Sequence, residues 1–391
     1  MGTGGDESMV ELFTDEQRLV RNTARVFAER ELIPAASDLD EREVFARELF
    51  LKLAELGFTG LMCPEKYGGS GMDTVTYVAV LEEISRGWVA MGGTLSVHIM
   101  VEQLLLSAGN EEQKTRFLGP LCRGEVLGAI AITEPEAGSD IGSIRTTAAA
   151  RGEDFVLNGN KIFITSGGEA DLYLVLCRTG RSGAETAVFA VEKGTPGLYF
   201  GKKERKMGYG GSPTRELVFE NCVIPGRNLL GRPGEGIKLM LRALDGGRIG
   251  VATMAVGLSQ AAFDCALAYA RERRQFGRPI ISFQAIQFML ADMATGIAAA
   301  RQLTYHAARL RDSGVPYTKE AAMAKLFASD TAMKITTDAV QILGGYGYMK
   351  DYPVERYMRE AKMLQIVEGT NQIQRLVIAR RLEDGTPAHY D

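Results

Sequence analysis

The feature that most constrains the fold is a block of short β-rich runs, between residues 124 and 231, inside a chain otherwise patterned as helix. Runs such as 172–177, 186–191 and 217–222 are apolar or alternate, and glycine, proline and charged residues separate them. Several short strands at this spacing are typical of a small barrel or sandwich. The pattern predicts an α+β protein. Its domains would be an N-terminal helical domain (1–122), a middle β domain (123–231) and a C-terminal helical bundle (232–391).

Apolar periodicity supports helices on both sides of this block. Leu49, Phe50, Leu53 and Leu56 recur three and four residues apart before a glycine, which is helical spacing. After residue 232, runs rich in alanine, leucine and methionine suit a four-helix bundle. The predicted helices there are 237–244, 250–273, 282–313, 318–343 and 372–382. Within the β block, the pair Asn158-Gly159 between two β-rich runs predicts a hairpin turn.

Composition excludes several classes of protein. The net charge of −4, without a dense basic stripe, argues against nucleic-acid binding. No apolar run approaches the ~20 residues that cross a bilayer, and residues 1–8 lack the features of a signal peptide. The five cysteines are scattered and the three histidines have no metal-ligand spacing, so we expect neither a disulfide framework nor a metal site. A cytoplasmic protein is expected.

Three segments carry chemical signals. One is the turn Thr133-Glu-Pro-Glu-Ala-Gly-Ser-Asp140, whose glycine and hydroxyls can approach a polar ring edge or a phosphate. The second is the glycine run 344–348, which exposes backbone after a helix. The third is 367–376, where the carboxylate of Glu368 precedes a Gly-Thr step and a helical stretch. Each segment alone would read as an ordinary turn or helix end. In this order and at these separations they resemble the acyl-CoA dehydrogenase family, along almost the whole chain.

The resemblance implies a reaction and a catalytic base. Glu368 is expected to remove the proton alpha to a thioester, while the beta hydrogen leaves as hydride to the flavin of FAD, giving a trans-2-enoyl-CoA. A minority of the family carries its base on an earlier helix, at a place where this chain has Gly247, so the role falls to Glu368. An electron-transferring flavoprotein would reoxidise the flavin. The family is usually a homotetramer, built as a dimer of dimers.

The resemblance also assigns the FAD contacts. Many members carry tryptophan where this chain has Phe163; phenylalanine keeps the apolar wall but loses the N–H donor. An arginine in an R-x-x-F-G motif, here Arg273, reaches the FAD pyrophosphate of the neighbouring subunit, although alone it would read as part of a solvated cluster. The expected contacts are Ile130, Ile132, Thr133, Gly138, Ser139, Phe163, Ile164, Thr165, Arg273, Gln275, Phe276, Gln284, Gln341, Ile342, Gly344, Gly345, Thr370, Asn371 and Gln372.

The acyl-CoA contacts implied by the resemblance are Ser139, Asp245, Arg248, Gly369, Val367 and Ser96. The family commonly has tyrosine where this chain has Val367. Its absence opens space near the alpha carbon, so we expect a short- to medium-chain substrate, with branched acyl groups included. His98 is expected to be a packed helix residue. The helix around Ser96 lacks the arginine of glutaryl-specific relatives, which argues against a dicarboxylyl substrate.

Three other interpretations stay open at this point. The acyl group could be carried by an acyl carrier protein in secondary metabolism, which a comparison of CoA and carrier-bound substrates would decide. The protein could be a flavin oxidase, which would form peroxide on turnover. It could also be a non-catalytic FAD-bound binding protein, although Glu368 in its Gly-Thr context argues against that.

Overall fold

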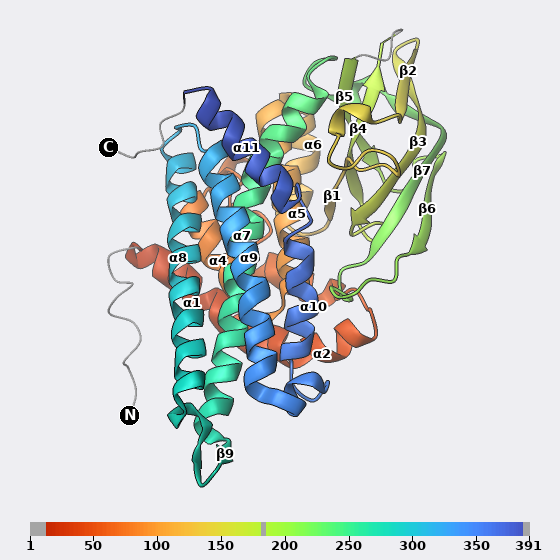
Figure 1. The fold of residues 1–391 in the computed structure, drawn as a ribbon. Coiled ribbons are helices and arrows are strands. Elements are labelled where there is room, and N and C mark those ends of the chain that lie inside the picture. Colours follow the sequence, from red (N-terminus) through yellow and green to blue (C-terminus); the bar gives the residue numbers. More distant parts are fainter. Residues whose placement is uncertain (1–12, 181–184, 386–391) are drawn as a thin grey trace.

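The computed structural model of the protein describes residues 13–180 and 185–385, in the order helices, sheet, helices (Figure 1). The α+β organisation predicted from the sequence is confirmed, and helical spacing at Leu49, Phe50 and Leu53 belongs to a real helix with these three side chains buried. The N-terminal helices are α1 (Asp15–Phe27), α2 (Ile33–Glu41), α3 (Arg47–Glu55), α4 (Thr74–Gly87), α5 (Val89–Ala108) and α6 (Glu111–Cys122). The prediction about residues 1–8 lies outside the described residues.

The middle of the chain forms one eight-stranded sheet beside the helices (Figure 1). The order is β6-β7-β3-β2-β4-β5-β8, and β1 pairs in parallel with β4. The strands are β1 (Gly128–Ala131), β2 (Thr147–Arg151), β3 (Asp154–Thr165), β4 (Leu172–Thr179), β5 (Glu185–Glu192), β6 (Leu198–Lys203), β7 (Thr214–Pro225) and β8 (Leu229–Leu230). The three apolar runs that predicted strands are β4, β5 and part of β7. Burial of every residue of β4 but one explains its unbroken apolar run.

The hairpin predicted at Asn158-Gly159 was wrong. Strand β3 continues through this pair and stays bonded to β7 on both sides, with a register shift that marks a bulge. Gly159 has φ +137°, and a Cβ there would lie 2.7 Å from the Thr146 Cα. The glycine therefore allows a close approach of β3 to Thr146, the residue before β2, and does not form a two-residue turn. The turn between β2 and β3 lies at Gly152, with φ +64°.

The C-terminal helices pack side by side as a bundle, with α7, α8 and α9 running along its length (Figure 1). They are α7 (Gly236–Glu272), α8 (Gln284–Asp312), α9 (Thr318–Leu343), α10 (Val354–Leu364) and α11 (Asn371–Glu383), and the short strands β9 (Arg274–Gln275) and β10 (Arg278–Pro279) join α7 to α8. As predicted, α9 ends before Gly344, which has φ +62°. The predicted break between 244 and 250 was wrong, because α7 runs unbroken through Gly246 and Gly247. Helix α10 was not predicted.

Helices α5 and α7 form the centre of the molecule. Both are long and apolar enough to cross a membrane by length and composition, but 83% and 67% of their most apolar windows are buried inside the fold. They are therefore core helices, and they pack against each other and against α4. The boundaries 122/123 and 231/232 stay predictions. The packing of α5 on α7 positions the site described next.

Candidate active site

Glu368 lies in the connection between α10 and α11, where two consecutive residues have positive φ. Glu368 has φ +53° and Gly369 has φ +93°. A non-glycine residue in the left-handed region is uncommon and indicates a backbone held by its surroundings. The residue is half-buried, but its Oε2 is buried and has no hydrogen-bond partner among the described residues. An unpartnered buried carboxylate oxygen is costly for folding, which marks this one as a candidate for function.

Two side chains hold this turn through its carbonyl groups. Lys325 on α9 donates to the Gly369 carbonyl (2.9 Å) and to the Asn371 Oδ1 (2.8 Å). Gln374 on α11 donates to the Glu368 and Gly369 carbonyls, at 3.2 and 2.8 Å. No described residue accepts a hydrogen bond from the Glu368 backbone N–H. The turn is thus fixed from its carbonyl side while the N–H and the carboxylate stay free.

The space for the carboxylate comes from Gly247 in the middle of α7. A Cβ at this position would overlap Glu368 Oε2 and lie 2.8 Å from Glu368 Cδ and 2.6 Å from Met100 Sδ. Glycine inside a helix destabilises it by roughly 0.5–1 kcal/mol relative to alanine. Any larger residue would displace the carboxylate. The glycine therefore lowers the stability of the helix but leaves space for Glu368.

The site is electrostatically tuned toward a neutral-pH base. Burial raises the pKa of Glu368 to about 7, and the charges of Arg248 and Lys325 oppose this shift. Burial also lowers the pKa of Lys325 to about 8. Arg248 is 4% exposed and its guanidinium is paired with Asp245 at 2.6 Å, but its Nε has no partner among the described residues. A carboxylate with a pKa near the working pH suits proton abstraction.

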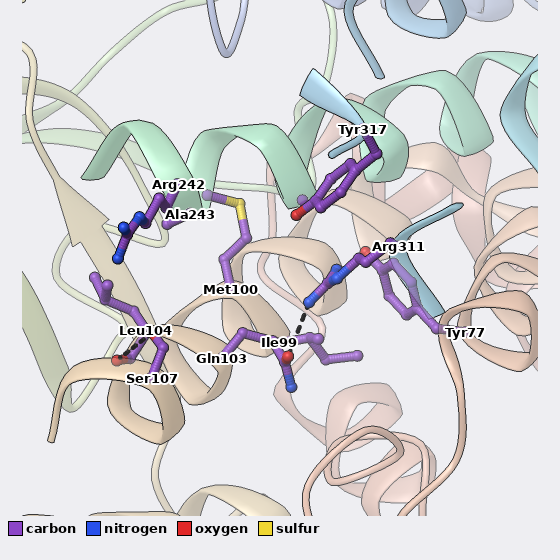
Figure 2. Close-up of a pocket in the computed structure, with 11 residues that line it drawn as sticks. Tyr77, Ile99, Met100, Gln103, Leu104, Ser107, Arg242, Ala243, Arg311 and Tyr317 are labelled. Atoms are coloured by element: carbon purple, nitrogen blue, oxygen red, sulfur yellow. Dashed lines mark hydrogen bonds between the residues drawn. The ribbon is translucent and has the colours of Figure 1, made fainter. Parts of the chain in front are cut away.

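A cavity of about 190 Å³ lies between α5 and α7 on the other side of Met100 (Figure 2). It is lined by Tyr77, Ile99, Met100, Gln103, Leu104, Ser107, Arg242, Ala243, Gly246, Arg311 and Tyr317. Since the Met100 sulfur also approaches the spot that Glu368 occupies above Gly247, the cavity and the carboxylate are close neighbours.

The segments predicted to meet the flavin ring lie together. The Ile162 N–H donates to the Thr133 carbonyl at 2.8 Å, which joins the loop after β1 to the end of β3. Phe163 has φ +57° at a register shift of β3, and its side chain is 65% exposed. Gly138 has open space where a Cβ would stand, and Ser139 is exposed. By contrast Ile164 is buried at 3%, and Ile130 and Ile132 pack partly against the core.

The loop after β1 is anchored by a buried ion pair. Glu134 accepts from Lys161 Nζ at 2.7 Å and from the backbone N–H groups of Arg145 and Thr146. These bonds and the Lys161 charge lower the pKa of Glu134, although its burial opposes them. The carboxylate therefore holds the loop in shape, and the exposed Gly138 and Ser139 are left for a ligand.

A second predicted group lies at the far end of the bundle, where Figure 1 shows β9 below the helices. Arg273 there stacks 5.5 Å from the Tyr346 ring, so the R-x-x-F-G segment and the glycine run 344–348 are brought together. Phe276 is 93% exposed with φ +50°, and nothing lies within 4 Å of a Cβ at Gly344 or Gly345. The exposed members of this group are Arg273, Gln275, Phe276, Gln284, Gln341, Gly344 and Gly345, whereas Ile342 is buried. In this single chain the group is apart from Phe163.

Of the three residues 370–372 predicted to contact FAD, two form hydrogen bonds within the protein and one is exposed. Thr370 caps α11 by accepting from the Ile373 N–H at 3.3 Å. Asn371 is 4% exposed, and its amide bonds Lys325, Ser329 and Asp330. Gln372 is exposed. Asn371 therefore supports the turn from within, and Gln372 is free to reach a ligand.

Of the predicted substrate contacts, Ser96 is fully buried and accepts a hydrogen bond from the Tyr77 hydroxyl at 3.1 Å. Val367 packs partly against the core. Asp245 is shared between Arg248 and the Thr318 hydroxyl. His98 is fully buried and accepts from the Gly128 N–H, and burial lowers its pKa to about 4. The prediction that His98 is a packed helix residue is confirmed.

Sequence reasoning missed several residues around Glu368. Tyr77 and Met100 come from α4 and α5, and Lys325 comes from α9. None stands in a motif. The sequence shows Lys325 only as a lysine in an alanine-rich helix; its full burial, which requires partners for its charge, becomes visible only in the structure. Among the described residues, no three His, Cys, Asp or Glu side chains are grouped so as to hold a metal ion.

The chain matches three sequence profiles: acyl-CoA dehydrogenase N-terminal domain over residues 14–125, middle domain over 129–222 and C-terminal domain over 234–383. The protein belongs to the acyl-CoA dehydrogenase family.

Individual relatives agree with this family. An acyl-CoA dehydrogenase of Bacillus subtilis (strain 168) is 51% identical, over 95% of this chain and 99% of the relative. The solved butyryl-CoA dehydrogenase of Megasphaera elsdenii is 43% identical with a TM-score of 0.93, over 98% of this chain and all of that chain. A chain in a structure described as the electron transferring flavoprotein of Acidaminococcus fermentans is 50% identical, with a TM-score of 0.93, over 95% of this chain and 98% of that chain.

Proposed function

We propose that this acyl-CoA dehydrogenase uses FAD to convert a short- to medium-chain acyl-CoA, branched acyl groups included, to the trans-2-enoyl-CoA. The observation that carries the proposal is the Glu368 carboxylate, which is buried, unpartnered at Oε2 and has a pKa of about 7. A general base works best with a pKa near the working pH and without competing hydrogen bonds, and the raised pKa of Glu368 and its unpartnered Oε2 fit both conditions.

Glu368 supplies two groups to the reaction. Its carboxylate takes the proton from the carbon alpha to the thioester. Its backbone N–H, which no described residue engages, donates to the thioester oxygen where negative charge develops. A donor fixed in advance stabilises this charge without reorganisation, and such stabilisation often contributes more to the rate than any other single effect. Lys325 and Gln374 do not contact the substrate in this proposal. They position Glu368 by donating hydrogen bonds to the carbonyl groups of the same turn.

Removing the proton also requires a low-dielectric site. Met100 and Gly247 lie against the carboxylate. Tyr77 and Ser96, joined by a hydrogen bond, pack next to them. The exclusion of water strengthens the attraction between the developing enolate and the Glu368 N–H. Arg248 keeps a positive charge near the site, which favours the ionised form of the base before substrate arrives.

The residues present fit FAD. Phe163 offers an exposed apolar face next to the Thr133 backbone, and Gly138 and Ser139 are open beside it. In a dimer, Arg273 and the bare backbone at Gly344 of a second subunit would hold the pyrophosphate and adenosine. FAD, when bound, supplies the two-electron acceptor for the beta hydrogen. The dimer-spanning site implies a homo-oligomer, and we propose the tetramer usual in the family.

We propose an electron-transferring flavoprotein as the acceptor. The support is the 50% identical chain in the structure described as an electron transferring flavoprotein. The short-chain range is supported by the butyryl-CoA dehydrogenase relative. Tolerance of branching is supported by Val367, a smaller side chain than the tyrosine that is common at this place in the family.

The test is an anaerobic titration of the purified holoenzyme with a panel of acyl-CoAs, following flavin absorbance. Butyryl-, isobutyryl-, 2-methylbutyryl- and hexanoyl-CoA should bleach the oxidised band, and Glu368→Gln should abolish bleaching with FAD still bound. A second readout is exchange of the alpha proton with deuterated water in a CoA analogue that has no transferable beta hydrogen. Exchange isolates the base from the flavin chemistry and should be lost in the same variant.

Several outcomes would contradict the proposal. A protein that binds FAD but is bleached by no acyl-CoA, and is bleached by an acyl group on a carrier protein, would move the substrate to the carrier-bound class. Stoichiometric peroxide on aerobic turnover would identify an oxidase. Normal exchange in Glu368→Gln would remove Glu368 as the base.

A further inference from the structure

The connection between β6 and β7, residues 204–213, packs against the helical part of the chain at three separate places (Figure 1). Three of its glycines lie so close to helical residues that a Cβ on any of them would stand within 3.0 Å of a neighbouring atom. The close pairs are Gly208 with Arg359 and Glu360 of α10, Gly210 with Asp40 of α2, and Gly211 with Trp88, which joins α4 to α5. Because glycine has no Cβ, it allows a backbone approach that other residues would prevent.

Hydrogen bonds fix the same connection to two of these helices. Arg359 on α10 donates to the Met207 carbonyl at 2.9 Å, and the Gly211 N–H donates to the Asp40 carboxylate of α2 at 3.2 Å. Between these two anchors, Tyr209 has φ +67°. A non-glycine residue in the left-handed region is uncommon and persists where the surroundings hold the backbone. The helices therefore hold the connection in one conformation.

The Tyr209 side chain enters the helical core and is 4% exposed. Its hydroxyl donates to the Met254 sulfur on α7 at 3.5 Å, and a Cβ at Gly93 on α5 would overlap this hydroxyl. Met254 follows Gly247 by seven residues, which places both on one face of α7. The phenol therefore enters the same layer between α5 and α7 in which the Glu368 carboxylate lies above Gly247.

The connection also touches both halves of the candidate active site. On the sheet side it leads into β7, whose Thr214 pairs with Thr165 at the end of β3, and the Ser166 N–H donates to the Pro213 carbonyl at 2.8 Å. This end of β3, residues 163–165, is the part proposed to face the flavin. On the helical side, the connection packs on α10, and the chain runs from α10 into the turn of Glu368.

We propose that the β6–β7 connection positions the end of β3 relative to Glu368, with Gly208 and Tyr209 as positioning residues for the transfer of the beta hydrogen. This rests on the proposed function and concerns the geometry of that same site. The carboxylate and the backbone N–H of Glu368 belong to one turn, so removal of the alpha proton depends on that turn. Transfer of the beta hydrogen depends in addition on the distance from the turn to the end of β3, because donor and acceptor must be aligned.

Two variants change this packing without removing a group from the site. Gly208→Ala places a Cβ 3.0 Å from the backbone of α10, whereas ordinary contact begins near 3.4 Å, so the connection and α10 must separate by about 0.4 Å. A misplacement of about 1 Å can cost roughly 100-fold in rate, so the rate of flavin bleaching by butyryl-CoA should fall about 5- to 10-fold. Tyr209→Phe removes only the hydroxyl that enters the helical core and should also slow bleaching.

The matched control is Gly201→Ala in β6. Its Cβ would also lie 3.0 Å from the nearest atom, but that atom is the Cβ of Glu216 in the neighbouring strand β7. The variant adds the same methyl group under the same crowding within the sheet, away from α10. It should bleach at the wild-type rate.

Three readouts on the holoenzymes separate positioning from general damage. Stopped-flow absorbance gives the rate of bleaching. Exchange of the alpha proton with deuterated water, in the analogue without a transferable beta hydrogen, should stay within about twofold of wild type in both variants, because the turn of Glu368 is unchanged. The third readout is the fluorescence of Trp88, the only tryptophan in the sequence, which is 1% exposed and lies against Gly211. Its emission should shift to longer wavelength in Gly208→Ala and stay unchanged in Gly201→Ala.

Several results would overturn the proposal. Equal losses of exchange and bleaching in Gly208→Ala would show damage to the whole site. Wild-type bleaching in Gly208→Ala, or in Tyr209→Phe where Gly208→Ala does not fold, would remove the connection from the reaction. Slowed bleaching with unchanged Trp88 emission in Gly208→Ala would exclude the route through the connection. The proposed function fails in a different way: the wild type itself would then neither exchange nor bleach with any acyl-CoA, although Trp88 still responded to Gly208→Ala.

Discussion

Replacing Gly247 by alanine should separate activity from stability. A Cβ at this position would lie 2.8 Å from Glu368 Cδ, and ordinary contact begins near 3.4 Å. The carboxylate must therefore move by about 0.6 Å or more, and the overlapping Oε2 further. Misplacement of a reacting group by about 1 Å can cost roughly 100-fold in rate. We expect kcat/KM for butyryl-CoA to fall by about that factor.

The fold should tolerate the same change. Alanine in a helix interior is favoured over glycine by roughly 0.5–1 kcal/mol, which offsets the strain at Met100. The free energy of unfolding should therefore change by no more than about 1 kcal/mol. Gly296→Ala on α8 is the matched control: its Cβ would meet a Thr331 methyl at 2.9 Å and an Ile335 methyl at 3.8 Å, and no atom of Glu368. It should gain the helix preference and keep full activity.

The assay compares steady-state kinetics, urea unfolding and FAD content for the wild type and both variants. Normal kcat/KM in Gly247→Ala would refute the reasoning, because it would mean that the space above α7 does not fix the position of the base. A large loss of unfolding free energy in Gly247→Ala would refute it differently, by showing that packing and not the carboxylate requires the glycine.

The remaining predictions concern charge and shape near the base. Because the folded pKa of Glu368 is about 7 and its ordinary value is 4.5, ionisation of this carboxyl destabilises the fold progressively as pH rises from 4.5 to 7. Glu368→Gln should therefore raise the unfolding free energy by up to roughly 3 kcal/mol at pH 8 and by nothing below pH 4.5. Equal gains at both pH values would contradict this. Lys325→Met removes a charge that lowers the pKa of Glu368, so the rising limb of the kcat/KM–pH profile should move to higher pH; an unmoved limb would exclude this coupling. Val367→Tyr should lower the ratio of isobutyryl-CoA to butyryl-CoA turnover, and an unchanged ratio would remove Val367 from the specificity argument. His98→Leu leaves the buried Gly128 N–H unbonded, which should cost about 1–3 kcal/mol in urea unfolding without changing acyl preference.

Local patterns in the sequence predicted helices and strands, and failed where tertiary contacts determine the backbone conformation. The helix end at Gly344 follows from glycine in the left-handed region, which is a local property. The predicted hairpin at Gly159 and the predicted helix break around Gly247 were wrong because a glycine pattern does not show what approaches the backbone. At Gly159 it is Thr146, the residue before β2, and at Gly247 it is the Glu368 carboxylate.

The candidate site divides in the same way. Glu368 stands in a recognisable string, so its place before Gly369 and Thr370 could be read directly. Lys325 lies 43 positions earlier in a plain helix and reaches the turn only because α9 packs beside α11. Side chains that converge from separate helices carry no sequence spacing by which to find them.

Helix α7 fixes the distance between the residues beside the base and Arg273. It is one unbroken element from Gly236 to Glu272, which at about 1.5 Å per residue is roughly 55 Å long. Gly247 and Arg248 sit on it beside the base, and Arg273 follows directly at its far end. One inserted residue between these points would turn everything beyond it by about 100° and advance it by about 1.5 Å. Away from Gly247 and Arg248, side chains along this helix can therefore be exchanged, but its length cannot change, and the spacing from Arg248 to Arg273 should be invariant wherever both arginines keep their roles.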